Sequence, residues 1–457
     1  MRRLSVATST GSDGLAPHAT QREQSTQRER LTNEHKRVLG GALVGTTIEW
    51  FDFFIYAQAA GLIFATQFFS PVSDQSPGLA QIIAWASLGI SFLFRPLGAI
   101  LAGHLGDRIG RKPVLVVTLV GMGLATFLMG LLPNYAAWGI AAPILLVLLR
   151  IMQGMSAGGE WGGAALIAVE HAPVLRRGYF GAFPQLGVPL GMMLATIMML
   201  TLTAAMSPEQ FEAWGWRIPF VSSLVLILVG FFIRRSVEES PVFTEMEQLR
   251  ERSSAPLKDL FAGHSKLVGL CALIFAGNNA AGYLLIAFFV SYGSKTLGFP
   301  RPTVLGIMLL GSAAWFFSTL ISGHISDIIG RKTIFVWGYA ALILWSLPLW
   351  VLVDTGQIFL FALATIVLGV LLGVTYGPQS ALYAEIFPAS VRLSGLNISY
   401  ALGSIIGGAF APMISQMILE QTGNAIYIGV YIAVLCFFSM LAVMAVPKGI
   451  QGRSLRQ

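Results

Sequence analysis

The amino-acid sequence predicts an all-α integral membrane protein with twelve transmembrane helices, arranged as two parallel repeats of six. Three observations lead to this prediction: an apolar composition, apolar segments of bilayer-crossing length, and two charged motifs that occur once in each half. Only 11% of the 457 residues are charged and 55% are hydrophobic, with a mean hydropathy of +0.71. About a quarter of an ordinary soluble domain is charged, so the composition excludes that class.

The predicted spans are the segments that are long and apolar enough to cross the bilayer as a helix, which takes about 20 residues. Between them lie short connections and one longer polar stretch. The twelve spans are expected near 38–67, 79–102, 113–132, 142–170, 179–204, 218–234, 267–292, 303–323, 333–353, 357–386, 395–419 and 426–446.

The polar stretches divide the chain into five parts. We expect a disordered cytoplasmic tail over 1–37, a six-helix bundle over 38–234, a cytoplasmic linker over 235–266, a second six-helix bundle over 267–446, and a short tail over 447–457. The first 35 residues are rich in Ser, Thr, Gln and Arg and have no apolar core, which argues against a cleaved signal.

The basic residues predict the orientation of the chain. Most of the 29 Lys and Arg residues fall in the tails, the linker and the connections that share one face with them. By the positive-inside rule that face is cytoplasmic, with both termini inside. The net charge of +7 is then a topological signal that also suits anionic lipid headgroups, and it needs no nucleic-acid partner. The exceptions are Arg217, Lys295 and Arg301 on the other face and Arg95 and Arg150 within spans.

Two motifs recur at nearly the same offset. The decapeptide GHLGDRIGRK at 103–112 returns as GHISDIIGRK at 323–332, and EHAP at 170–173 has its counterpart in EIFP at 385–388. Six crossings per half give both copies the same orientation in the membrane. Such parallel repeats place a substrate site near the midplane, where the halves meet.

The repeated motifs predict a cytoplasmic gate. Gly103 and Gly106 suit a tight turn, Asp107 can accept hydrogen bonds from helix N-termini, and the acids that end the fourth span of each half can pair with nearby arginines. A plain positive-inside loop is the alternative interpretation. The predicted gate residues are Asp107, Arg108, Arg111, Glu170, Arg177, Asp327, Arg331, Glu385 and Arg392.

Five charged residues fall inside the predicted spans of the first half: Glu49, Asp52, Arg95, Arg150 and Glu160. Each costs roughly 2.5 to 3.5 kcal/mol at the centre of a bilayer, so they must face an interior. On a helix, Glu49, Asp52 and Tyr56 share one stripe, and Arg150, Gln153, Ala157 and Glu160 share another.

These charges predict a coupling of protons to an anionic substrate. Burial favours the neutral form of a carboxylate and a nearby arginine favours the ionised form, so a substrate that captures the arginine frees the acid to take up a proton. We expect Arg95 and Arg150 to hold a substrate carboxylate. Asp52 is the first candidate for the proton carrier, before Glu49 and Glu160; a structural ion pair is the alternative role for each acid.

The second half has no buried charge at the matching positions, which are Thr365, Leu368 and Thr375. Amides and phenols stand in its spans, and they suit the hydroxyl, carbonyl or apolar parts of a small solute. We expect cargo recognition there, with helix-to-helix hydrogen bonding as the alternative. The further candidate binding residues are Tyr56, Gln153, Gln185, Asn278, Asn279, Tyr283, Tyr376, Gln379, Tyr383, Asn397 and Tyr400.

Nothing in the sequence indicates an enzyme. It has no nucleophile-and-base constellation, no metal-ligand spacing and no phosphate-binding loop, and its two cysteines form no C-x-x-C pair. We therefore expect no cofactor and no metal, and a monomer whose partners are its small-molecule substrate, protons and lipids.

The repeated decapeptide resembles the signature of the major facilitator superfamily. Further stretches are similar to the metabolite:proton symporter family of bacteria within it: IEWFDFFIY at 48–56, RIMQGMSAGGEWGGA at 150–164, WGWRIPF at 214–220, EESPVF at 238–243 and YGPQSALYAEIFPASVR at 376–392. The resemblance implies the major facilitator fold and an inner-membrane symporter that works by alternating access. Known members carry α-ketoglutarate, citrate, shikimate, or proline and betaine.

Residues and resemblance together predict a proton-coupled importer of a small organic acid. Two alternatives stay open. One is uptake of a zwitterionic osmolyte such as proline or betaine. The other is drug and proton antiport, which only the partial motif Gly187-Val-Pro189-Leu-Gly191 favours.

Overall fold

The structure, a computed structural model, describes residues 33–109, 111–158, 160–236, 256–389, 391–447, 449–451 and 455. Within these ranges the side chains of 33–34, 103–115, 226, 230–236 and 256–259 are left out of the description. Val38–Gln457 forms one compact unit and Met1–Arg37 a separate one. Apart from the first turn of its first helix, the architecture below belongs to Val38–Gln457.

The first half of the chain forms six long helical segments. In order they are α2 (Asn33–Ala59) with the π-helix η1 (Ala60–Phe64) and α3 (Ala65–Gln67); α5 (Pro77–Ile109); α6 (Arg111–Leu131); α8 (Ala141–Ala157) with α9 (Glu160–Glu170); α10 (Arg177–Ala205); and α12 (Arg217–Ser236). The connections carry the short elements α4 (Ser70–Ser73), α7 (Tyr135–Trp138), η2 (Val174–Arg176), α11 (Pro208–Gln210) and η3 (Phe211–Gly215).

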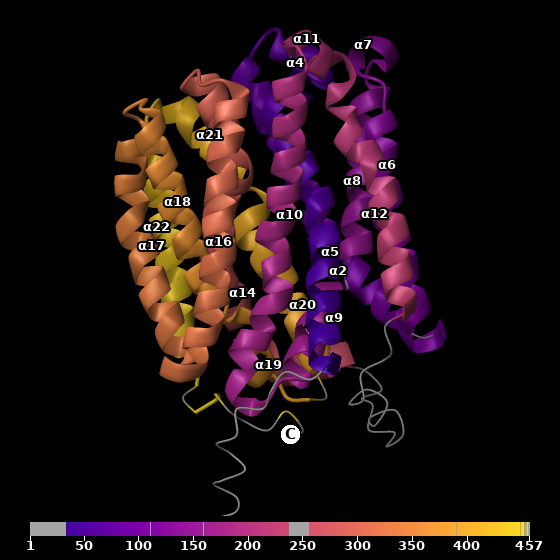
Figure 1. The fold of residues 1–457 in the computed structure, drawn as a ribbon, viewed down its shortest axis with the longest axis vertical. Helices are drawn as coiled ribbons and strands as arrows, with labels where there is room; N and C mark the ends of the chain where they lie inside the picture. The colour runs from indigo at the N-terminus through magenta and orange to yellow at the C-terminus, as the bar shows by residue number, and fades with distance from the viewer. Residues whose placement is uncertain are drawn as a thin grey trace, which may run out of the picture. The chain divides into compact units, whose positions relative to one another are not determined.

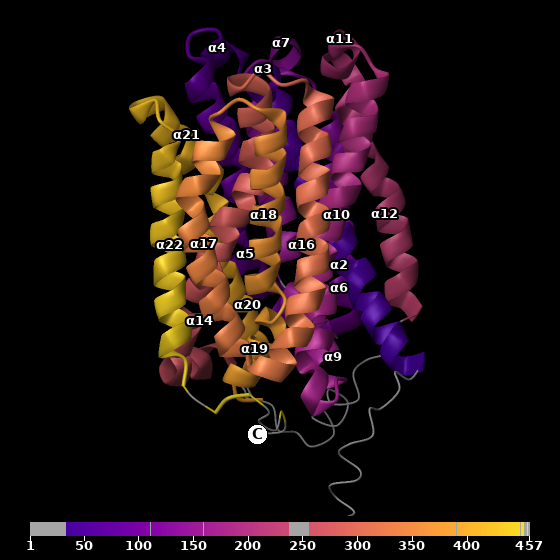
Figure 2. The same cartoon turned by 60° about the vertical axis from the view of Figure 1, so that its left-hand side comes forward.

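The second half also forms six. They are α14 (Pro256–Tyr283) with η4 (Leu284–Phe288), α15 (Phe289–Ser291) and η5 (Tyr292–Thr296); α16 (Arg301–Ile329); α17 (Arg331–Val353); α18 (Ile358–Tyr376) with α19 (Gln379–Ile386); α20 (Arg392–Gly403) with η6 (Ser404–Ala409) and α21 (Ala411–Thr422); and α22 (Ile426–Ala445). In Figures 1 and 2 the long helices run side by side, with α4, α7 and α11 at one end and α19 at the other.

The twelve-span prediction is confirmed. In the described part of the chain, ten helical segments are long and apolar enough to cross a membrane. The other two are α6, whose apolar part is Val116–Leu131, and the bent pair Pro208–Gly215 with Arg217–Val229, which turns by 45°. The largest difference in boundaries is at α14, which begins at Pro256 rather than near 267. The two decapeptides extend α5 to Ile109 and α16 to Ile329, beyond the ends expected near 102 and 323.

The turn predicted at the start of the decapeptide is wrong. The backbone is helical through Ile109 in the first copy and through Ile329 in the second, so Gly103 and Gly106 lie within a helix. In the second copy the chain turns at Gly330, whose φ of 101° lies in the region that glycine adopts without a steric penalty. Gly110, the matching residue of the first copy, lies outside the described residues.

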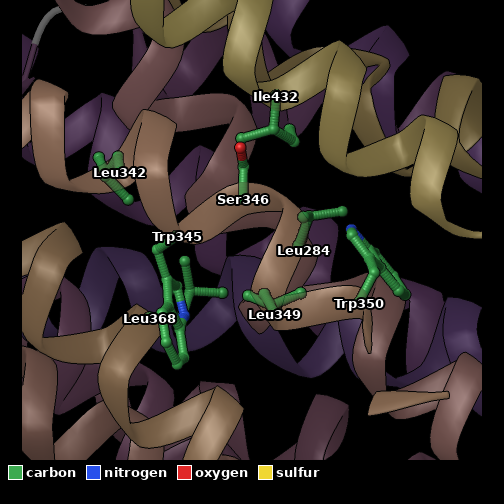
Figure 3. A pocket seen from close by; sticks show the side chains of 8 residues that line it. All are labelled: Leu284, Leu342, Trp345, Ser346, Leu349, Trp350, Leu368 and Ile432. Atoms are coloured by element: carbon green, nitrogen blue, oxygen red, sulfur yellow. The ribbon is translucent and has the colours of Figure 1, made fainter. Parts of the chain in front are cut away.

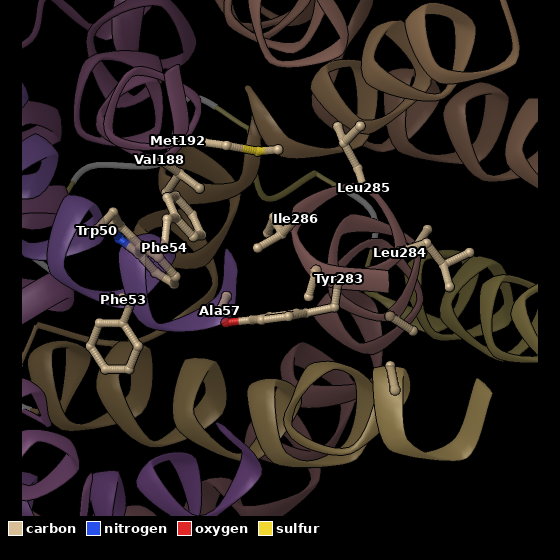
Figure 4. Packing of buried hydrophobic residues seen from close by; sticks show 14 of the residues in the cluster. Trp50, Phe53, Phe54, Ala57, Val188, Met192, Tyr283, Leu284, Leu285 and Ile286 are labelled. Carbon is tan, nitrogen blue, oxygen red and sulfur yellow. The ribbon is translucent and has the colours of Figure 1, made fainter. Parts of the chain in front are cut away.

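Several helices of the two halves pack directly against each other. The α10 helix lies along α16, α5 contacts α20, η6 and α21, and α9 contacts α19 and α20. The π-helices η1 and η4 meet as well. Figure 4 shows side chains of α2, among them Phe54 and Ala57, opposite Tyr283 at the end of α14 and Ile286 of η4. Residues buried along these helices are therefore the ones that both halves can reach.

Close helix contacts depend on glycine at Gly369 of α18. A Cβ atom added there would lie 2.1 Å from the carbonyl oxygen of Gly311 on α16, whereas one added at Gly306 would have no atom within 4 Å. Backbone atoms cannot move aside as a flexible side chain can, so α16 and α18 would have to separate.

We predict that Gly369→Ala destabilises the protein by about 1–3 kcal/mol, the usual cost of overpacking. Gly306→Ala is the matched control and should be neutral or slightly stabilising, because alanine favours helix over glycine. Thermal unfolding of the detergent-purified variants measures the difference. Equal melting temperatures for the two variants would contradict this account of the contact.

Candidate functional site

Arg150 is a fully buried arginine at the centre of the first half. Its Nη2 donates to the carbonyl oxygen of Leu88 at 3.0 Å and to the hydroxyl of Ser91 at 2.7 Å, both on α5. Its Nη1 donates to Oε1 of Gln153 on its own helix. The guanidinium carbon lies 3.8 Å from the centre of the Tyr56 ring on α2. Neutral groups of three helices thus hold this cation.

A chain of hydrogen bonds leads from Arg150 to Asp52. The Nε2 of Gln153 donates to the hydroxyl oxygen of Thr126 on α6 at 2.9 Å. That hydroxyl lies 3.3 Å from Oδ2 of Asp52 and 3.1 Å from the carbonyl oxygen of Met122. Asp52 is 1% exposed, and its Oδ1 has no hydrogen-bond partner.

Arg95 is the second buried arginine, and aromatic rings surround it. Its guanidinium carbon lies 4.3 Å from the ring centre of Phe53, 4.6 Å from that of Phe92 and 5.2 Å from that of Trp50. Phe53 also lies beneath Arg150, at 5.2 Å. Rings attract a guanidinium through their negative faces but do not neutralise it. The Nε and Nη2 atoms of Arg95 have no hydrogen-bond partner.

Neither buried arginine is paired with an acid. Across the described residues, Arg95 and Arg150 take part in none of the ion pairs. The hydroxyl of Tyr283 on α14 lies within electrostatic range of both and has no hydrogen-bond partner. Its ring meets Phe92 edge-on at 5.6 Å. The two cations and this phenol form a group of hydrogen-bond donors that both halves share.

The predicted acids are all buried. Glu49 is 2% exposed and lies within electrostatic range of Tyr376 and Tyr400 of the second half. Glu160, 6% exposed, begins α9 and accepts a hydrogen bond from Thr118 at 3.1 Å. The structure describes α8 to Ala157 and α9 from Glu160, with Gly158 still in a helical conformation and Gly159 outside the described residues, so the stripe from Arg150 to Glu160 stays a prediction.

An aromatic stack joins the two halves. Trp161 of α9 stacks on Tyr400 of α20 with ring centres 3.9 Å apart, and Tyr400 stacks in turn on Phe275 of α14 at 4.4 Å. The hydroxyls of Tyr400 and Tyr376 lie 3.4 Å apart. Trp161 was not among the predicted site residues, although it stands in the quoted GGEWGGA motif beside Glu160.

Amides bridge the halves next to this stack. Gln185 of α10 accepts from the indole N–H of Trp161 at 2.8 Å and donates weakly to Oε1 of Gln379 at 3.4 Å. Asn397 of α20 accepts from the backbone N–H of Gly162 at 2.9 Å. The structure thus brings the predicted Gln185, Gln379 and Asn397 together in one cross-half network.

Other predicted residues of the second half are used within it. Asn278 donates to the carbonyl oxygen of Leu372 at 3.0 Å and to Thr375 at 2.6 Å. Tyr383 donates to the carbonyl oxygen of Cys271. These contacts match the alternative interpretation of helix-to-helix bonding. Asn279 differs, because its buried Nδ2 has no hydrogen-bond partner.

Charged residues form a cluster where α16 meets α17, here named the ion-pair end. Arg331 donates to both carboxylate oxygens of Glu385, at 2.8 Å and 3.1 Å, and to Asp327 at 2.9 Å. Arg177 of the first half lies 3.6 Å from Glu385. All of these side chains are buried or nearly so, so the cluster holds α10 against α16, α17 and α19.

Asp327 also binds the start of α10. Its two oxygens accept from the backbone N–H groups of Gly178 and Tyr179, at 2.8 Å and 2.9 Å. A helix N-terminus has unsatisfied N–H groups and a positive dipole end, which favour an anion. Glu170 and Arg392 add a weaker pair at 3.9 Å. The side chains of Asp107, Arg108 and Arg111 lie outside the described residues.

The opposite end carries cross-half contacts that were not predicted. Lys295 donates to Oε1 of Gln81 at 2.7 Å, and Arg301 pairs with Glu212 at 2.8 Å. Charge patterning alone could have singled out Lys295 and Arg301, since they are among the few basic residues at that end, but it does not indicate their partners. Contacts between the halves therefore exist at both ends of the helices.

A separate small cavity lies within the second half, between η4, α17, α18 and α22 (Figure 3). Its lining is apolar except for Ser346 and the indole nitrogens of Trp345 and Trp350. No charged side chain lines it, so it does not suit an ionic solute.

Comparisons with known proteins agree with this architecture. Residues 42–412 match the family described as Major Facilitator Superfamily. The chain is 38% identical to the inner membrane metabolite transport protein YhjE of Escherichia coli (strain K12), over 90% of this chain and 94% of that protein. It is 33% identical to the shikimate transporter of the same organism, again over 90% and 94%.

A further relative is the glycine betaine/proline/ectoine/pipecolic acid transporter OusA of Dickeya dadantii (strain 3937), 31% identical over 89% of this chain and 82% of that protein. Among solved structures, the proton:xylose symporter XylE bound to 6-bromo-6-deoxy-D-glucose aligns with a TM-score of 0.74 and 17% identity, over 93% of this chain and 98% of that one. At that identity the likeness concerns the fold alone.

The apolar helices and the matches over nearly the whole length agree with the resemblance seen in the motifs. The chain is a multi-pass membrane transporter and belongs to the major facilitator superfamily, within its metabolite:proton symporter family.

Proposed function

We propose that this transporter imports a small organic acid together with protons, by alternating access. The observation that carries the proposal is the pair of buried arginines, Arg95 and Arg150, which have no carboxylate partner among the described residues. An isolated charge in a low-dielectric interior is unfavourable by several kcal/mol unless it is paired. A carboxylate substrate supplies the missing countercharge.

The second half contributes neutral groups to the same place. Tyr283 offers a free hydroxyl near both arginines, and Asn279 offers a free amide N–H. Hydroxyl and amide groups discriminate solutes by hydrogen bonding without adding charge. A small acid that carries hydroxyl or carbonyl groups fits this combination, in keeping with relatives whose names state shikimate and metabolite transport.

A zwitterionic osmolyte is the second candidate, because a relative is named for betaine and proline and aromatic rings can bind a cation. The ring faces of Phe53 and Tyr56 are already taken by guanidinium groups. Those of Trp161 and Tyr400 cover each other. These contacts occupy ring faces that an ammonium group would need, and the two buried arginines favour an anion, so we rank the anion first. Nothing beyond the partial motif at 187–191 favours drug antiport.

Asp52 is the proposed proton carrier, with Glu49 and Glu160 as the other candidates. It is buried, and among the described residues it pairs with no base and its Oδ1 has no hydrogen-bond partner. Glu160 is 6% exposed and accepts a hydrogen bond from Thr118 at 3.1 Å. The described hydrogen bond to Asp52 comes from a neutral hydroxyl, so its charge is not compensated by a cation in direct contact.

Alternating access requires the two ends to open in turn. By the positive-inside rule, we assign the ion-pair end to the cytoplasm, with both termini inside the bacterial inner membrane. The cluster of Arg177, Asp327, Arg331 and Glu385 then acts as the cytoplasmic gate. A monomer is sufficient for this cycle, because gate and binding groups all come from one chain.

Uptake of labelled shikimate, α-ketoglutarate, citrate and proline into proteoliposomes tests the function. We expect an inward proton gradient to drive accumulation of an acid above its external concentration, and a protonophore to abolish it. Accumulation of proline in preference to every acid would favour the hypothesis that the substrate is a zwitterionic osmolyte. Equal uptake with and without the gradient would remove symport.

Substitutions test the site. Arg150→Ala should abolish binding of the acid, because the fork of N–H donors is lost. Asp52→Asn should retain exchange of labelled for unlabelled acid but lose gradient-driven accumulation, because an amide cannot take up a proton. Arg217→Ala is the control, because it removes an arginine at the start of α12, and it should retain both binding and accumulation. Normal accumulation by both Arg150→Ala and Asp52→Asn would refute the assignment.

The proposed cytoplasmic gate can be tested by chemical labelling. A cysteine placed at Ser326, which is buried beside Arg331, should react with a membrane-impermeant maleimide only when the cluster opens. Glu385→Gln removes the anion that holds two arginines, and breaking such buried pairs costs about 3–5 kcal/mol. We expect labelling to rise at least about tenfold. Glu420→Gln, at the exposed opposite end, should leave labelling unchanged; equal rates in both variants would contradict the gate.

A further inference from the structure

Asp52 and Arg150 are not in contact with each other. Two neutral side chains, Gln153 and Thr126, stand between them and are joined to both by hydrogen bonds. A coupling mechanism has to explain how substrate binding to Arg150 changes the protonation of Asp52. The hydrogen-bond directions along this chain give the explanation.

The direction of each bond follows from the chemistry of the groups. A guanidinium only donates, so Arg150 must face the carbonyl oxygen of Gln153. The amide nitrogen of Gln153 then points to Thr126 and donates to its oxygen at 2.9 Å. With that lone pair used, the single hydroxyl hydrogen of Thr126 has two acceptors within reach, Asp52 Oδ2 at 3.3 Å and the Met122 carbonyl oxygen at 3.1 Å.

The hydroxyl of Thr126 can therefore donate to either of two acceptors, Asp52 or the carbonyl oxygen of Met122. When Asp52 is ionised, donation to its carboxylate is favoured, because a hydrogen bond to a charged acceptor is about twice as strong as a neutral one. When Asp52 is protonated, the hydroxyl can turn to Met122, on its own helix. Every donor in the chain points from the cation toward the acid, so Arg150 polarises the whole chain in favour of the ionised acid.

We propose that Gln153 and Thr126 are positioning residues that transmit the occupancy of Arg150 to the protonation of Asp52. This inference rests on the proposed function. A substrate carboxylate that draws the guanidinium away from Gln153 leaves the amide free to rotate, and the chain loses its cationic end. The bond from Thr126 to the ionised acid is then no longer strengthened by the cation, so the neutral form of Asp52 is favoured and the acid takes up a proton from water. No proton travels along the chain; its bonds only reorient.

Ionisable groups lie on the elements around this part of the first half. Glu49 and Tyr56 lie on the helix of Asp52, Arg95 comes from α5, Arg150 from α8 and Tyr283 from α14, while Glu160 of α9 contacts α6 at Thr118. Among the described residues, Thr126 is the one whose side chain donates a hydrogen bond to Asp52. The Thr126 hydroxyl is thus the contact through which the arginine acts.

Thr126→Val tests the proposal, since it removes the hydroxyl and keeps the shape. We expect exchange of labelled acid to stay within about twofold, and the pH dependence of proton-driven accumulation to move upward by about one unit, because the ionised form of Asp52 has lost a donor. Accumulation at the wild-type optimum should fall up to about tenfold and return when both bulk pH values are raised by about one unit.

Three further variants separate coupling from packing. Thr126→Ser keeps a hydroxyl and should restore the wild-type pH profile. Gln153→Leu should shift the pH dependence of accumulation upward by the same amount. The double variant Gln153→Leu/Thr126→Val should shift it no further, because both substitutions interrupt the same chain of hydrogen bonds. Thr201→Val, whose hydroxyl bonds only its own helix on the exposed face of α10, should leave the profile unchanged.

The outcomes distinguish the two proposals. If wild-type protein accumulates an acid but Thr126→Val keeps the wild-type pH profile, or Thr126→Ser behaves like Thr126→Val, the transmission through these residues is refuted and symport stands. If Thr126→Val does not fold, the pH profile of Gln153→Leu decides in the same way. If wild-type protein shows no proton-driven accumulation, the proposed function itself fails.

Discussion

The whole arrangement depends on two positive charges that are buried without a negative partner. Arg95 and Arg150 lie among aromatic rings and neutral acceptors, contacts that orient a guanidinium but leave its charge in place. A lipid-embedded bundle tolerates such charges only in its interior, where an anion can reach them. The same burial makes Asp52 responsive, since few described contacts favour its ionised form over its neutral one.

The rest of the fold keeps these groups between two halves that touch at both ends. At the ion-pair end, Glu385 and Asp327 tie α16, α17 and α19 to the start of α10. At the other end, Lys295 and Gln81 link η5 to α5. Contacts built from a few ion pairs and hydrogen bonds can break and reform, which suits a protein whose halves rock around a fixed site.

The sequence predicted the twelve spans and the burial of all five membrane charges, because apolar length and the cost of a charge in lipid are local properties. It did not predict which groups meet. Asn278 and Tyr383 were candidates for cargo binding and instead bond neighbouring helices. Thr126 and Trp161 were missed, since a lone threonine or tryptophan in an apolar span carries no signal until tertiary contacts place it beside Asp52 or Tyr400. The position of the turn at Gly330 was not predicted either, because it depends on how far helix α16 continues into the decapeptide.

The most direct test of the central claim is to count the protons that the purified protein takes up when it binds an acid. Isothermal titration in buffers of different ionisation enthalpy gives that number. We expect the wild-type protein to take up about one proton per carboxylate bound, because Asp52 becomes protonated when the substrate binds Arg150. Asp52→Asn should take up none. Binding without proton uptake, or the same uptake in Asp52→Asn, would contradict it.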